Sequence, residues 1–288
     1  MPSPLIFTMF HYIKPAPKYR CMARIPRNHP RRISLILRER LVNGFEQGLA
    51  CKEGLIAQGR GEAFDYLLGE RTQGFAKSSA RAAAACLLLA EKPVISVNGN
   101  LAALCPKDVV RLAEATGAEI EANLFYRTEK RMKAIERKLR ASGAKNVLGL
   151  ETGLSRIPEL FSERRRASRR GICPADAVLL AMEDGDRTKA LRRMGKKVVA
   201  IDLNPLSVTA KQADITVVDN AVRAVPLIAR EARKLRKARR EMLLSILKKY
   251  DNGKARREAI ACIAKRLTGG CREPGTVVER AVPERTRR

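Results

Sequence analysis

Short apolar runs that alternate with longer helical patterns constrain this chain more than any other feature. The strand-like runs are residues 93–97, 119–124, 146–150, 175–182, 197–201 and 215–218. Apolar side chains at helical spacing predict helices over residues 34–49, 76–90, 107–116, 128–142, 187–194 and 220–249, the last with room for one break. Residues 54–61, between the first two helices, are punctuated by glycine. The alternation predicts an α/β fold, Rossmann-like, with a mostly parallel sheet covered by helices and with helical N-terminal and C-terminal segments.

The net charge of the chain is +28, from 58 Lys and Arg against 30 Asp and Glu. The excess lies in residues 1–32, 126–170 and 229–288, whereas the two blocks between them are close to balanced. These basic segments make a nucleic-acid-binding protein the alternative function. Nucleic acid is nevertheless not an expected partner, because only 4% of the residues are aromatic and few of them are placed to stack on bases. Solvated helix faces and a basic tail explain the charge better.

Composition also bears on the compartment. No apolar stretch approaches the ~18 to 20 residues of a membrane-spanning helix, so we expect no membrane partner. The seven cysteines show no C-x-x-C spacing and are accompanied by only two histidines, so neither a zinc site nor a disulfide framework is indicated. We therefore expect no resident metal site and a reducing, cytoplasmic location.

Polar residues follow the first predicted strand. Asn98, Gly99 and Asn100 stand between that strand and an apolar helical stretch. A glycine in such a turn lets backbone N–H groups converge on an anion, and the following helix adds the positive end of its dipole. A simple tight turn explains the same three residues equally well.

A second polar group, Glu-Asp-Gly-Asp-Arg-Thr at residues 183–188, follows another predicted strand. Its carboxylates repel one another unless a cation or a sugar hydroxyl lies among them, and Arg187 offers an anion contact beside them. The mixture suits a nucleotide, with carboxylates toward ribose or Mg²⁺ and Arg187 toward phosphate. Acidic residues that cap a helix are the alternative of similar weight.

The third polar group, Asp202, Leu203 and Asn204, follows the strand predicted at residues 197–201. An acidic residue at this place accepts hydrogen bonds from a ribose in Rossmann-like folds. The sequence contains neither G-x-G-x-x-G nor G-x-x-x-x-G-K-[ST], which argues against an NAD-dependent oxidoreductase and against a P-loop. A polar turn that caps the next helix stays open as the alternative.

Arg60 lies between two glycines, which clear space for a ligand around its guanidinium group. Arg38, on the helix predicted at residues 34–49, is a candidate to join it. Taken alone, either arginine is more typical of a solvated surface.

Together these motifs resemble the archaeal phosphopantothenate synthetase family, also called 4-phosphopantoate:β-alanine ligase. The resemblance runs from about Met22 to Lys254 and rests on five ordered blocks, residues 59–70, 94–104, 123–129, 183–188 and 201–207. It implies an acid–amino-acid ligase of coenzyme A biosynthesis, active as a homodimer. In such a ligase ATP, with Mg²⁺, activates the carboxylate of 4-phosphopantoate as an acyl adenylate with loss of diphosphate. The amine of β-alanine then displaces AMP and forms 4′-phosphopantothenate.

The resemblance also assigns site residues, position by position. Those expected to bind ATP are Arg38, Arg60, Asp184, Gly185, Asp186, Arg187, Thr188, Asp202, Leu203 and Asn204. Those expected on the phosphopantoate side are Asn98, Gly99, Asn100, Arg127 and Asn220. It identifies no residue as the base that deprotonates the β-alanine amine.

Two positions depart from the family pattern. Gln58 stands where family members commonly have His, so it carries no charge and cannot act as a base there. Residues 162–166, Ser-Glu-Arg-Arg-Arg, replace a His-Glu-Arg-Gly-like block, so a role for that block is not carried over. We expect residues 1–21 to be a dispensable extension, residues 22–254 the ligase domain, and residues 255–288 a basic helical segment with a mobile tail.

Overall fold

The computed structural model describes residues 25–26, 28–29 and 31–269 of the chain. By its internal contacts the chain divides into two compact units, residues 1–39 and 40–288. Helix α1 (Arg32–Glu46) begins in the first unit, and every other helix and strand of the described residues lies in the second. The expected extension at residues 1–21 and the last part of the expected basic tail lie outside the described residues.

Five parallel strands form the sheet of the second unit, in the order β2-β1-β5-β6-β7. They are β1 (Pro93–Val97), β2 (Glu119–Ala122), β5 (Ala177–Ala181), β6 (Lys197–Ile201) and β7 (Ile215–Val217). Every residue of β1 and β5 is buried, as expected where both faces of a parallel sheet are covered. The predicted α/β fold with a parallel sheet is confirmed.

The direction of winding across the sheet changes once, between β1 and β5. The chain passes from β1 to β2 on one side and then returns to β5 on the other, so that β1 and β5 are neighbours. At such a switch point the connections leave in opposite directions, and a crevice opens beyond the carboxyl ends of the two strands. The polar groups that follow β1 and β5 therefore meet at that edge of the sheet.

Helices and short connections complete the second unit. They are α2 (Lys52–Leu68), α3 (Gly74–Leu89), α4 (Gly99–Leu104), α5 (Pro106–Thr116), α6 (Glu129–Arg140), β3 (Ser155–Arg156), the 3₁₀ turn η1 (Glu163–Arg165), β4 (Arg166–Ala167), α7 (Gly185–Arg193), α8 (Val208–Gln212), α9 (Ala221–Leu235), α10 (Arg240–Lys249) and α11 (Asn252–Leu267). The helical segment expected at residues 220–249, with room for one break, is divided once, between α9 and α10. Helix α11 runs across the expected boundary after residue 254. None of the helices within the described ranges has the length and apolar character needed to cross a membrane.

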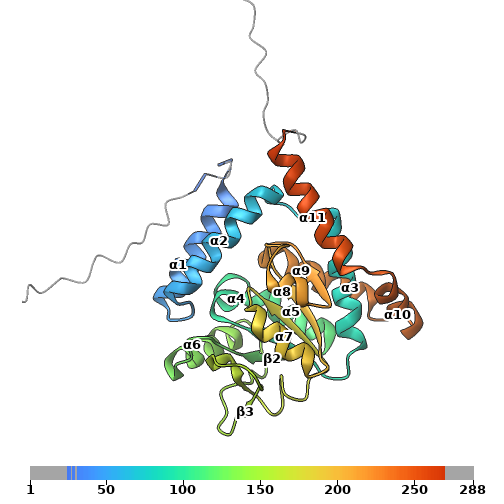
Figure 1. Cartoon of the computed structure of the whole chain (residues 1–288). Coiled ribbons are helices and arrows are strands. Elements are labelled where there is room, and N and C mark those ends of the chain that lie inside the picture. Colours follow the sequence, from blue (N-terminus) through green and yellow to red (C-terminus); the bar gives the residue numbers. More distant parts are fainter. Residues whose placement is uncertain (1–24, 27, 30, 270–288) are drawn as a thin grey trace, which may run out of the picture. The chain divides into compact units, whose positions relative to one another are not determined.

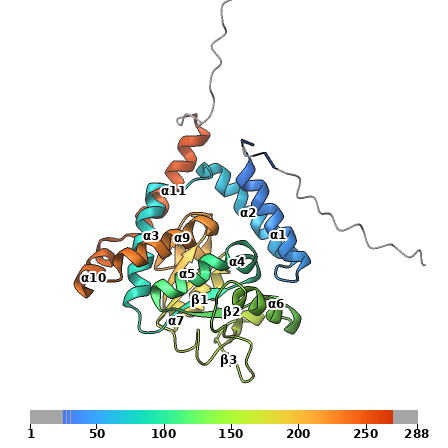
Figure 2. The ribbon, with the colours of Figure 1, turned by 180° about the vertical axis from the view of Figure 1, so that it is seen from behind.

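The two faces of the sheet are covered differently. Helices α3, α5 and α9 pack against one another on one face (Figure 2). The alanines of α3 from Ala82 to Ala85 are fully buried, because such small side chains let helices approach closely. On the other face lies α7 (Figure 1). There α7 and residues 157–175 bury Leu191, Ile157 and Ile172 against β5 and β6.

The strand predicted at residues 146–150 is wrong. Only Leu148 pairs, through an isolated parallel bridge to Glu121 of β2. Gly149 follows with a φ of +93°, a conformation that glycine adopts without strain and that turns the chain away from the sheet. A Cβ at Gly149 would lie 2.4 Å from the carbonyl oxygen of Ala122, so the close approach also requires glycine.

The glycine-punctuated stretch at residues 54–61 is not a break but the middle of α2. A Cβ at Gly54 would lie 2.4 Å from Oδ1 of Asn100, and one at Gly61 would touch Leu203 at 3.5 Å. Glycine lowers helix propensity, yet here it lets α2 approach the loops after β1 and β6. The glycines therefore bring a helix against the strand ends.

Candidate functional site

A cavity of about 490 Å³ lies beyond the carboxyl ends of β1, β5, β6 and β7, with α2 along one side. A ligand pocket of this size holds a molecule of substrate dimensions. Nine predicted site residues line it: Arg60, Asn98, Gly99, Asn100, Asp184, Asp202, Leu203, Asn204 and Asn220. It lies where the topology of a parallel sheet predicts a ligand.

The loop after β1 shapes the cavity through two asparagines. Asn98 caps α4 by accepting a hydrogen bond from the Leu101 N–H at 2.9 Å, and its Nδ2 donates to the Ala181 carbonyl at 2.7 Å. It thereby joins the ends of β1 and β5 across the switch point. Asn100 Nδ2 donates to the Gly54 carbonyl at 2.7 Å and fixes α2 to the same loop.

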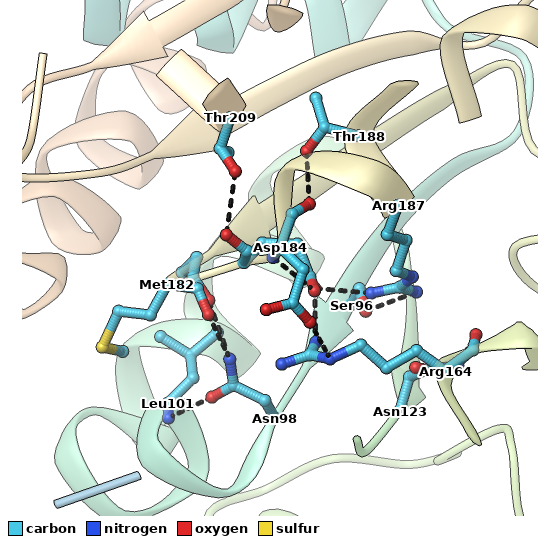
Figure 3. A network of polar contacts seen from close by, with 12 residues as sticks. Ser96, Asn98, Leu101, Asn123, Arg164, Met182, Asp184, Arg187, Thr188 and Thr209 are labelled. Carbon is cyan, nitrogen blue, oxygen red and sulfur yellow. Dashed lines mark hydrogen bonds and ion pairs between the residues drawn. The ribbon is translucent and has the colours of Figure 1, made fainter. Parts of the chain in front are cut away.

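A buried ion-pair network lies at the end of β5. Oε2 of Glu183 pairs with Nη1 of Arg187 at 2.6 Å and also with Arg164. The Arg187 guanidinium donates to Oγ of Ser96 at 3.1 and 3.2 Å, and its side chain is fully buried. Figure 3 shows Arg187 reaching Ser96 and Arg164 lying beside Asp184. One buried carboxylate thus holds two guanidinium groups, and Arg187 is engaged inside the protein.

Asp184 lines the cavity together with Glu183 and Arg164. Nε of Arg164 lies 3.1 Å from Oδ2 of Asp184. Burial raises the pKa of Asp184, and the opposite charge of Arg164 acts against that rise. The loop backbone is fixed from outside, since Thr209 Oγ1 donates to the Glu183 carbonyl at 2.8 Å and Thr188 Oγ1 to the Asp184 carbonyl at 3.2 Å (Figure 3).

Asp202 organises the loop after β6. Its carboxylate accepts hydrogen bonds from the Asn204 N–H at 2.9 Å and from Oγ of Ser207 at 2.5 Å. Burial raises the pKa of Asp202, whereas these two hydrogen bonds and the charge of Arg60 lower it. Each carboxylate oxygen has one donor within the protein, so each keeps acceptor capacity for a ligand hydroxyl.

A second buried cluster fixes α2 to the end of β7. Nδ2 of Asn220 donates to Oδ2 of Asp65 at 2.9 Å. Arg223 pairs with Asp65 and, at 2.6 Å, with Asp219. Burial raises the pKa of Asp219, and the nearby Arg223 charge opposes that rise. Asp65 lies on α2 and Asp219 lines the cavity, so this cluster joins the helix to the floor of the site.

Arg131, Arg164 and Asp219 line the cavity but were not among the predicted site residues. Arg131 lies on α6, where it donates to the carbonyl of Tyr126 and, at 2.9 Å, to that of Leu49. Arg164 comes from the block at residues 162–166 that departs from the family pattern. Gln58, the other departure, is also buried in the cavity wall. No local pattern marks Arg164, because its partner Glu183 lies 19 residues further along the chain.

Six predicted residues do not line the cavity. Gly185, Asp186, Arg187 and Thr188 form the first turn of α7, and Arg187 points into the buried network. Arg127 donates to the Gly149 carbonyl, and burial lowers the pKa of its guanidinium. Arg38 belongs to the first unit, residues 1–39. Direct contacts of these six residues with a ligand stay predictions.

Comparison with known proteins matches the sequence of this chain to one family. Residues 75–266 fit the model of the phosphopantothenate/pantothenate synthetase family. The chain is 52% identical over 248 residues to the 4-phosphopantoate–β-alanine ligase of Thermococcus onnurineus, a match that covers 86% of this chain and 95% of the relative. The protein of the same name from Methanosarcina mazei is 50% identical over 254 residues, covering 88% of this chain and 100% of the relative. On this similarity the chain belongs to the phosphopantothenate/pantothenate synthetase family.

Proposed function

We propose that this chain is a ligase that uses ATP to condense 4-phosphopantoate with β-alanine, releasing AMP and diphosphate and forming 4′-phosphopantothenate for coenzyme A biosynthesis. The observation that carries this proposal is identity of at least 50% to proteins named 4-phosphopantoate–β-alanine ligase over 86–88% of the chain. The cavity supports it, because arginines and carboxylates line one space at a switch point of the sheet.

We assign the nucleotide to the half of the cavity beyond β6. Asp202 is placed to accept hydrogen bonds from ribose hydroxyls, with Leu203 and Asn204 beside the base. Arg60 faces this half from α2 and offsets the charge of the phosphates. Asp184 borders it from β5, and residues 185–188 support that loop through α7. Arg38 is proposed as a further phosphate contact on the family resemblance alone.

The residues present fit the binding of Mg²⁺ together with ATP. Among the described residues no group of three or more His, Cys, Asp or Glu side chains is arranged to hold a metal ion. Mg²⁺ bound with a nucleotide needs no such group, because phosphates and water supply most ligands and one or two carboxylates suffice. Asp184 is the candidate carboxylate, since Glu183 is taken up by two arginines. When bound, Mg²⁺ offsets the negative charge of the phosphates.

In the first chemical step a carboxylate oxygen of 4-phosphopantoate forms a bond to the α-phosphorus of ATP, and the bond to diphosphate breaks. Both reactants are anions, so the step needs fixed cations near the point of contact. Arg60 and Arg164 line the cavity there, and Arg164 is held in place by Glu183 and Asp184. Cations that are already oriented stabilise the developing charge without reorganising.

In the second step the amine of β-alanine attacks the acyl carbon, loses a proton and displaces AMP. We place the acyl substrate at the loop after β1, where Asn98, Gly99 and Asn100 line the cavity, and Asn220 borders the same space from β7. Asn98 and Asn100 act by fixing this wall, since both side-chain amides donate to backbone carbonyls. We propose Arg127 as a further phosphate contact on the family resemblance alone.

We also propose that the enzyme is a cytoplasmic homodimer. Exposed apolar side chains on the second unit support a partner surface, namely Ile56 and Tyr66 on α2 and Leu267 on α11. Sedimentation of the purified chain tests this part, with a mass of twice 32.0 kDa as the expected result.

The proposed reaction is tested with purified protein, ATP, Mg²⁺, 4-phosphopantoate and β-alanine. AMP and diphosphate should appear in step with 4′-phosphopantothenate, and omission of β-alanine should abolish steady-state release of AMP. Release of ADP and orthophosphate instead, or no turnover of this substrate pair, would contradict the proposal.

A further inference from the structure

Arg131 differs from Arg164, the neighbouring cavity arginine of the same basic segment, in what balances its charge. Arg164 is paired with Glu183 and Asp184. The hydrogen bonds of Arg131 go only to neutral backbone carbonyls, and no carboxylate of the described residues forms an ion pair with it, although its charge attracts the exposed carboxylate of Glu53 in the same cavity lining. A cation of this kind in a cavity wall attracts an anionic ligand.

The guanidinium of Arg131 is also fixed in place with part of its donor set unused. Its two carbonyl partners, on Leu49 and Tyr126, belong to segments far apart in the sequence and hold both Nη atoms. Its Nε is buried and has no hydrogen-bond partner among the described residues. A buried donor without an acceptor is costly, so an acceptor from a ligand would be favoured here.

Gly99 packs directly against this guanidinium from the loop after β1. A Cβ at position 99 would lie 3.0 Å from Nη2 of Arg131 and 2.1 Å from the Leu49 carbonyl oxygen. Any side chain there would therefore crowd Arg131 and displace the backbone that holds it. The glycine keeps this corner of the cavity open.

The position of Arg131 separates it from the nucleotide half. Its neighbours Gly99 and Tyr126 follow β1 and β2, whereas Asp202 follows β6, which lies two strands from β1 and three from β2. With neighbouring strands ~4.8 Å apart, the two ends of the cavity are separated by about 10–14 Å. A ligand that reacts with ATP and also reaches Arg131 must be elongated, with a second anionic group at its far end.

We propose that Arg131 binds the 4-phosphate of the acyl substrate and so distinguishes 4-phosphopantoate from pantoate. This inference rests on the proposed function. A phosphate monoester is a dianion with several acceptor oxygens that fit the donor fork of arginine. The other substrate anion, the carboxylate of β-alanine, is joined by a short chain to the amine that attacks the acyl carbon, so it stays near the reacting atoms.

The test compares 4-phosphopantoate with pantoate as substrates of the wild type and of Arg131→Met. The variant should lose about 10- to 100-fold in kcat/KM for 4-phosphopantoate, the effect of one charge-assisted contact. Its KM for ATP and its kcat/KM for pantoate should stay unchanged. Arg137→Met is the matched control, because Arg137 is an exposed arginine on the same helix and should show wild-type values with every substrate.

Binding is measured in parallel as the rise in melting temperature with 4-phosphopantoate or with pantoate, since this readout does not depend on turnover. Loss of the phosphate-dependent rise in Arg131→Met supports the inference even if the proposed reaction fails. An equal rise in melting temperature with 4-phosphopantoate in the wild type and in Arg131→Met overturns the inference. An equal loss of activity on 4-phosphopantoate and pantoate, or a change confined to the KM for β-alanine, overturns it as well. If the methionine variant does not fold, Arg131→Lys replaces it, with a smaller loss confined to 4-phosphopantoate.

Discussion

Replacing Arg187 with methionine tests whether this arginine serves the nucleotide or the fold. The sequence predicts an anion contact, whereas the guanidinium lies fully buried between Glu183 and Ser96. Methionine keeps an unbranched, flexible stem and removes the charge with its hydrogen bonds. A residue that binds phosphate and a residue that stabilises the core respond differently to this change.

The magnitude depends on what the substitution leaves behind. Removal of one partner of a buried ion pair costs ~3–5 kcal/mol when the other charge is left alone. Glu183 keeps its pair with Arg164, but the buried hydroxyl of Ser96 loses its donor, so we expect the lower end, about 3 kcal/mol. In a unit of this size each kcal/mol lowers the melting temperature by ~2–4 °C, which predicts a fall of about 6–12 °C.

Thermal unfolding followed by circular dichroism gives the melting temperature, and initial rates give the KM for ATP. The control is Lys189→Met, which removes a cation from the exposed face of the same helix and should leave both values unchanged. For Arg187→Met we expect the lower melting temperature with a KM for ATP within about threefold of wild type at a temperature where the variant is folded. An unchanged melting temperature together with a KM raised tenfold would refute the reasoning, because the guanidinium would then have to leave Glu183 and bind phosphate.

Three further changes test other parts of the structure. Arg60→Ala should lower kcat/KM for ATP at least about tenfold, the effect of one charge-assisted contact, and a wild-type value would remove Arg60 from the site. Gly54→Ala should lower the free energy of unfolding by ~1–3 kcal/mol, because the added Cβ would lie 2.4 Å from Oδ1 of Asn100. Gly59→Ala is the control and should not destabilise α2, because the space around its added Cβ is open. Equal effects of the two substitutions on the free energy of unfolding would contradict this packing. Burial raises the pKa of Glu121 from 4.5 to about 7, so the folded chain keeps a proton that the unfolded chain loses. The free energy of unfolding should therefore fall by up to ~3 kcal/mol as pH rises from 4.5 to 7. Urea titrations should show this pH dependence in the wild type and not in Glu121→Gln. If the variant keeps the same pH dependence, Glu121 is not its cause.

The sheet could be predicted from the sequence because its strands are buried on both faces and read as continuous apolar runs. The predicted runs 93–97 and 197–201 coincide with β1 and β6. The run at 146–150 has the same local character, but it lies at the sheet edge, where Gly149 turns away after one bridge. Strand order could not be predicted, since it depends on pairing between distant segments. A single sequence shows whether a segment is apolar, but it does not show which strand that segment pairs with.

The site was predictable where the fold itself brings residues together. Asn98, Asp184 and Asp202 follow different strands, and parallel strands present their carboxyl ends at one edge. The direction of a side chain within such a loop was not predictable. Arg187 stands four residues after Glu183, a spacing that suits an exposed phosphate contact and an internal ion pair equally well. The buried hydroxyl of Ser96, distant in sequence, is part of what makes the internal position stable.

The basic segment at residues 126–170 shows why net charge says little about a binding site. We interpreted its excess as solvated surface, yet Arg131 and Arg164 of this segment line the cavity, beside Arg60 from a balanced block. The charge of Arg164 is offset by Glu183 and Asp184, which lie in another segment, whereas Arg131 donates hydrogen bonds only to carbonyl groups and forms no ion pair within the described residues. Two arginines of the same cavity and the same basic segment therefore differ in their capacity to attract an anion. What decides this capacity is the pairing of each cation in three dimensions, because a paired guanidinium must give up a carboxylate before it can bind a phosphate, and an unpaired one need not.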